Sequence, residues 1–156
     1  MQLRKYQLFW EQWYPIGIAV GSGAVTAFCT LRWRWTPPAT VKDLFPSIVN
    51  VAAIAIGFLA AAQAILFSIE QKKIIQQLKD AEYFDFVVDY MSTAIAWSFA
   101  LALFTSVAML IDWEKQAGYP QKMIAAALSL WVALLVVTVL SYFRVVRVFS
   151  RLLRDG

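Results

Sequence analysis

Four long stretches without a charged residue constrain the fold of this chain more than any other feature. They occupy residues 12–31, 44–69, 90–111 and 123–143, and are 20, 26, 22 and 21 residues long. A helix needs about 20 residues, rising about 1.5 Å each, to cross roughly 30 Å of hydrocarbon. Because four such stretches leave little of the 156 residues for anything else, the sequence predicts an all-α integral membrane protein with four transmembrane helices.

The composition supports this class. Hydrophobic residues make up 61% of the chain and charged residues 15%, whereas soluble domains are roughly 45–50% apolar and about 25% charged. We therefore expect a single transmembrane domain over residues 1–156. The expected spans are about 13–31, 44–69, 89–111 and 123–143.

Lysine and arginine predict the orientation. With the N-terminus inside, nine of the 14 basic residues lie on the inner side and five on the outer side. Cytoplasmic loops carry the excess of basic residues in membrane proteins, so both termini are predicted to be cytoplasmic. The nine inner residues are Arg4, Lys5, Lys72, Lys73, Lys79, Arg144, Arg147, Arg151 and Arg154.

Two charged segments extend the predicted spans into the cytoplasm. The sequence EQKKIIQQLKD follows the second span with no glycine or proline to end the helix. We expect a helical hairpin over residues 70–88, with a cytoplasmic protein partner binding there. The fourth span continues into a basic helix at 144–156.

The arginines of this last helix are spaced 3, 4 and 3 residues apart, which places them on one helical face. Such a face predicts contact with anionic lipid of the inner leaflet. A voltage sensor would instead carry its arginines within a span. No direct contact with nucleic acid is expected. The four residues are Arg144, Arg147, Arg151 and Arg154.

The stretch PIGIAVGSGAVTAFC at residues 15–29 contains three glycines. A phosphate-binding loop needs a strand before its glycines and a helix after them, whereas this stretch lies inside an apolar span and is predicted to be helical. Small residues there, and again in the second span, let helices approach closely. They can meet within a subunit or between subunits. The predicted packing or interface residues are Gly17, Gly21, Gly23, Ala53, Gly57 and Ala64.

Few residues of the chain can do chemistry. There is no histidine, there is one cysteine, and no carboxylate lies deep in a span. We therefore expect no enzymatic activity, no cofactor and no metal site. Two amides, Asn50 and Gln63, lie within the second span. Each either hydrogen-bonds a neighbouring helix or lines a polar pore.

Residues 48–97 resemble a pattern in small four-span bacterial membrane proteins that accompany antiviral defence systems. Its elements are an apolar span with GFL at 57–59, a charged helical extension, and an aromatic turn at Tyr83 and Phe84. Members often have a threonine just after GFL, where this chain has alanines at 60–62. The resemblance implies an inner-membrane effector or accessory, which permeabilises the membrane or anchors a cytoplasmic partner.

The spans contain too few polar residues for one subunit to enclose a wet channel, so we expect a homo-oligomer. The alternative function is a channel or facilitative transporter for an ion or small solute. A purely structural scaffold is a third hypothesis.

Overall fold

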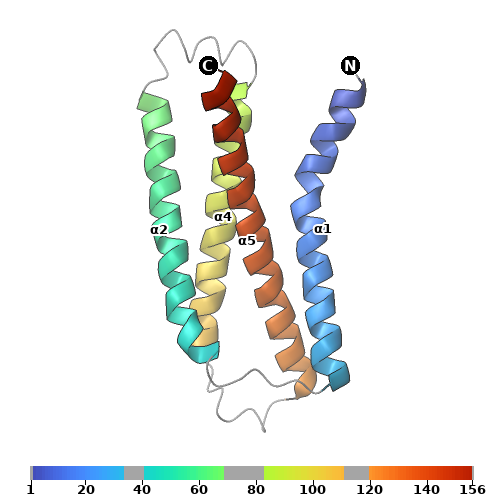
Figure 1. Ribbon diagram of the computed structural model, residues 1–156. Coiled ribbons are helices and arrows are strands. Elements are labelled where there is room, and N and C mark those ends of the chain that lie inside the picture. Colours follow the sequence, from blue (N-terminus) through green and yellow to red (C-terminus); the bar gives the residue numbers. More distant parts are fainter. Residues whose placement is uncertain (1, 34–40, 69–82, 111–119, 156) are drawn as a thin grey trace.

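The computed structural model describes the chain at residues 2–33, 41–68, 83–110 and 120–155. These residues form four helices (Figure 1), which confirms the all-α prediction for the described part of the chain. The helices are α1 (Gln2–Trp33), α2 (Val41–Ser68), α4 (Tyr83–Met109) and α5 (Gln121–Asp155).

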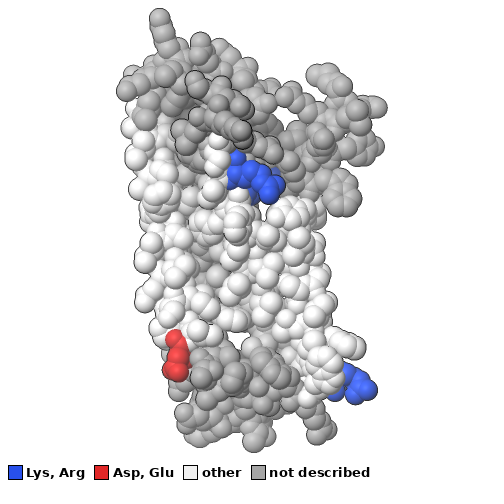
Figure 2. All heavy atoms as spheres, viewed as in Figure 1, with Lys and Arg blue, Asp and Glu red and all other residues white. Residues whose placement is uncertain are grey.

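Each helix contains a segment long and apolar enough to cross a membrane. These segments are Trp13–Trp33, Asp43–Ser68, Val87–Met109 and Gln121–Val148. In the view of Figure 2 an uncharged band lies across the middle of the described surface, with charged side chains towards its two ends. These are the features of a multi-pass membrane protein, as predicted.

The helices pack as antiparallel neighbours in the spatial order α1, α5, α4, α2. The α4–α5 pair forms the centre, and α1 and α2 lie on opposite sides of it (Figure 1). Both termini lie at the same end of the molecule. Which end faces the cytoplasm is a prediction from the basic residues alone.

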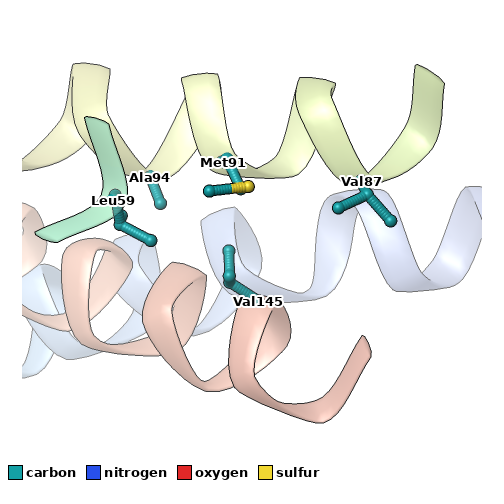
Figure 3. Packing of buried hydrophobic residues seen from close by; sticks show 5 residues of the cluster. All are labelled: Leu59, Val87, Met91, Ala94 and Val145. Carbon is teal, nitrogen blue, oxygen red and sulfur yellow. The ribbon is translucent and has the colours of Figure 1, made fainter. Parts of the chain in front are cut away.

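One cluster of buried apolar residues joins three helices. Leu59 of α2 and Val145 of α5 pack on Val87, Met91 and Ala94 of α4 (Figure 3). Met91 and Ala94 are 0% exposed. Because the cluster draws on α2, α4 and α5 at the level where α4 begins, it fixes how these three helices are rotated against one another.

The glycine-rich stretch at residues 15–29 lies wholly inside α1 and is helical, in agreement with the prediction. The predicted cytoplasmic extension of the second span falls largely on residues 69–82, which lie outside the described residues. The last helix, α5, runs without a break from Gln121 through the arginines to Asp155.

Candidate functional site

Two faces of α2 differ in what covers them. One face is buried against the neighbouring helices through Phe45, Ala52 and Leu59, which are 2%, 5% and 3% exposed. Residues five positions further on lie about 140° around the helix, and these are exposed. We call this exposed set the back face of α2. Its residues are Asn50, Gly57 and Ala64.

Asn50 is the polar member of the back face. It lies seven residues after Asp43, where the apolar segment begins, which is a depth of about 10 Å at about 1.5 Å per residue. Its amide makes no hydrogen bond to any residue that the structure describes. Lipid tails supply neither donors nor acceptors, so an amide left towards them costs several kcal/mol. The described residues of the subunit leave this amide without a partner.

Gln63, the second amide that the sequence singled out, lies on a different side of α2. Its Nε2 donates to the Ser92 Oγ of α4 at 3.1 Å. This is the contact that the helix-packing alternative predicts. Ala53 is exposed and lies beside the back face.

The glycines of α1 also divide between two environments. A Cβ at Gly23 would lie 3.0 Å from the Ser129 carbonyl oxygen and 3.3 Å from the Ala133 Cβ, so this glycine lets α1 approach α5 closely. A Cβ at Gly17 or Gly21 would meet nothing within 4 Å. Gly57 on the back face of α2 is equally open. The small residues of α1 and α2 therefore do not meet each other within one subunit.

Polar side chains inside the subunit pair with one another. The Trp131 Nε1 donates to the Thr105 Oγ1 at 3.0 Å, and the Ser98 Oγ lies 2.8 Å from the Tyr142 hydroxyl oxygen. The Gln121 Nε2 donates to the Thr30 carbonyl oxygen at 3.0 Å, which ties α5 to α1. These pairs satisfy groups in the packed interior, so the exposed Asn50 stands apart from them.

Arg144 and Arg147 of α5 lie in different environments. Arg144 is half-buried, and its Cζ lies 3.6 Å from the centroid of the Tyr90 ring on α4. Arg147 is exposed. For Arg151 and Arg154 the structure describes the helix but not the side chains.

Sequence reasoning missed Tyr90, Gln121 and Tyr142, each of which contacts a neighbouring helix. One signal was available for Tyr142: it follows Thr138 by four residues, and so lies on the same face of α5. Thr138 hydrogen-bonds the Trp97 carbonyl oxygen of α4 at 3.2 Å. Nothing in the sequence pairs Tyr90 with Arg144, because the contact joins two helices.

The arrangement leaves an exposed face with one amide and two small residues on α2, and a basic, aromatic contact between α4 and α5. No known protein family, curated protein or solved structure matches the chain.

Proposed function

We propose that this chain is a non-enzymatic membrane protein that assembles with copies of itself through the back face of α2. In the assembled form it permeabilises the membrane. The observation that carries this proposal is the exposed Asn50 amide, which lies in line with Gly57 and Ala64 inside a helix of spanning length.

A second copy of the chain fits this surface better than lipid does. An asparagine amide both donates and accepts hydrogen bonds, so two Asn50 side chains from facing subunits can pair directly. Gly57 and Ala64 remove side-chain bulk on the same face, which allows the backbones of two α2 helices to pack closely. A symmetric contact brings the same residues of both copies together.

Assembly would also supply the polar path that a single subunit lacks. Within the subunit, the buried hydroxyl groups of Ser98 and Thr105 bond their own helix and a neighbouring ring. In a ring of α2 helices around a common axis, each Asn50 amide would contact the amide of the next copy and would also border that axis. Ser47 and Ser68, which are exposed on the same side of α2, would line the path above and below.

The resemblance of residues 48–97 to small membrane proteins of antiviral defence systems supports an effector role in the inner membrane of a bacterium. In such a role a signal from a cytoplasmic partner would trigger permeabilisation. Neighbouring genes are an inexpensive check: defence or nuclease genes favour the effector, and metabolic genes favour a solute channel or facilitative transporter.

The test compares Asn50→Leu with Val51→Leu in liposomes. Leucine is close to asparagine in size but cannot hydrogen-bond, and Val51 is an exposed apolar neighbour (66% exposed) on the same turn. Interhelical hydrogen bonds are worth about 0.6–2 kcal/mol, so Asn50→Leu is expected to weaken association roughly three- to thirtyfold. Ion flux should fall or change selectivity, while Val51→Leu behaves as the wild type.

A wild-type chain that is strictly monomeric in nanodiscs would contradict the proposal. Folded oligomers that conduct no ions would contradict the permeabilisation part of the proposal but not the assembly part. They would favour the second candidate function, an anchor that recruits a cytoplasmic partner. The charged sequence EQKKIIQQLKD at 70–80 supports this candidate, and a pull-down on residues 70–88 tests it.

A further inference from the structure

The contact between Arg144 and Tyr90 leaves part of a charged group unsatisfied. The guanidinium lies over the ring at 3.6 Å, a cation–π arrangement that holds its plane in one orientation. The Arg144 Nη2 is buried and has no hydrogen-bond partner among the residues that the structure describes. Because an unpaired donor on a buried charge is costly, the guanidinium favours an acceptor beyond those that the described residues provide.

The depth of Arg144 in the bilayer indicates which kind of acceptor lies near it. It lies 23 residues after Gln121, where the spanning segment of α5 begins, and this corresponds to about 35 Å along the helix. The hydrocarbon core is about 30 Å thick. With Gln121 at one surface, the guanidinium therefore lies in the headgroup layer of the other. Tyr90 lies three residues into the spanning segment of α4, a position typical of interfacial aromatic rings.

A second cation lies beside the first. Arg147 follows Arg144 by three residues and is exposed, and residues at this spacing are neighbours on a helix surface. Figure 2 shows basic atoms gathered towards the end of the molecule that carries the termini. Arg144 and Arg147 are the basic side chains described at that end.

We infer that Arg144, oriented by Tyr90 and assisted by Arg147, binds the phosphate of an anionic phospholipid at the α4–α5 contact. A guanidinium stays charged and donates strong hydrogen bonds to phosphate oxygens, and the second arginine selects for a headgroup with net negative charge. The site lies within one subunit and is independent of the assembly proposed above. Asp89, exposed next to Tyr90, would repel a phosphate, so the two arginines must supply the attraction.

The experiment measures lipid retention by native mass spectrometry of delipidated protein. The lipids added are phosphatidylglycerol or phosphatidylcholine of the same chain length, and inorganic phosphate forms a third arm. We expect retention of phosphatidylglycerol, with binding of the other two at least about tenfold weaker. Arg144→Gln should lower phosphatidylglycerol binding about tenfold or more, since it removes a charge-assisted hydrogen bond.

Matched variants separate the site from a general effect of charge. Lys122→Gln removes one positive charge from the opposite end of the molecule and should leave binding unchanged. Tyr90→Phe keeps the ring and should bind as the wild type does, whereas Tyr90→Leu should bind several-fold more weakly. Arg144→Lys keeps the charge without the planar fork and should be intermediate, which tests the site even if Arg144→Gln folds poorly.

Three results would overturn the inference. Undiminished phosphatidylglycerol binding by folded Arg144→Gln would show that the site lies elsewhere. An equal loss of phosphatidylglycerol binding in Lys122→Gln would show that the effect depends only on the net charge of the protein. Inorganic phosphate binding as tightly as the lipid would replace the lipid site with one for a free anion.

Discussion

A glycine in a spanning helix acts through the side chain it lacks, and its neighbours decide what that absence allows. At Gly23 the space that a side chain would occupy is taken by α5. The Ser129 carbonyl oxygen of α5 would lie 3.0 Å from an added Cβ. At Gly57 an added Cβ would meet nothing within the subunit. The first glycine therefore serves the fold of one subunit, and the second is free to serve a contact between subunits.

Leucine at these two positions should have opposite effects. Gly23→Leu forces α1 away from α5 and should destabilise the subunit by about 1–3 kcal/mol, the usual cost of overpacking. Gly57→Leu should leave subunit stability nearly unchanged and reduce self-association. Unfolding in mixed detergent with increasing SDS measures the first effect, and the size of the assembly in nanodiscs measures the second. Equal loss of subunit stability in both variants would contradict the exposure of the back face.

At the scale of elements, polar contacts hold α4 against α5 near one end and in the middle of the pair. They connect rings and hydroxyl groups to partners on the facing helix, in surroundings where water does not compete. In lipid such bonds average about 0.6 kcal/mol and reach about 1.7 kcal/mol. The pairs are Thr105 with Trp131, Trp97 with Thr138, and Ser98 with Tyr142.

A double-mutant cycle tests one of these bonds, from the Trp131 indole to the Thr105 hydroxyl. Trp131→Phe keeps an aromatic ring near Phe45, whose own ring centroid lies 5.5 Å from that of Trp131. Thr105→Val removes the acceptor. The two changes should couple by about 0.6–1.7 kcal/mol in the free energy of unfolding. A coupling energy indistinguishable from zero would show that this hydrogen bond does not stabilise the α4–α5 pair.

At the scale of the whole molecule, assembly through α2 makes a geometric prediction. In a Cys29→Ser background, Ala61→Cys on the exposed side of α2 should form a disulfide between subunits when membranes are oxidised. Ala52 is buried within the subunit at 5% exposure, so Ala52→Cys should not form this disulfide. A disulfide needs Cα atoms within about 7 Å, so the reaction reports direct proximity. Cross-linking through Gly21→Cys but not Ala61→Cys would move the interface to α1.

The number and approximate position of the spanning helices could be predicted because the bilayer imposes a length rule on uncharged sequence. The helical state of the glycine-rich stretch followed from the same rule, since lipid does not tolerate unpaired backbone groups. The basic residues near Arg144 were also visible, because their spacing is local. Their separate environments were not, because Tyr90 approaches Arg144 from another helix.

The rotation of each helix about its own axis could not be predicted from the sequence, for a physical reason. In a water-soluble protein, apolar residues mark the inner face of a helix. Lipid tails are as apolar as leucine, so both the inner and the outer face of a spanning helix are apolar. On α2 the exposed residues include Phe58 at 73% and Ile54 at 73%, while the small Ala52 is buried. Sequence alone therefore determined the class, the four spans and the short list of polar and small residues. Tertiary packing decided that Gln63 and Gly23 are used within the subunit and that Asn50 and Gly57 face outward.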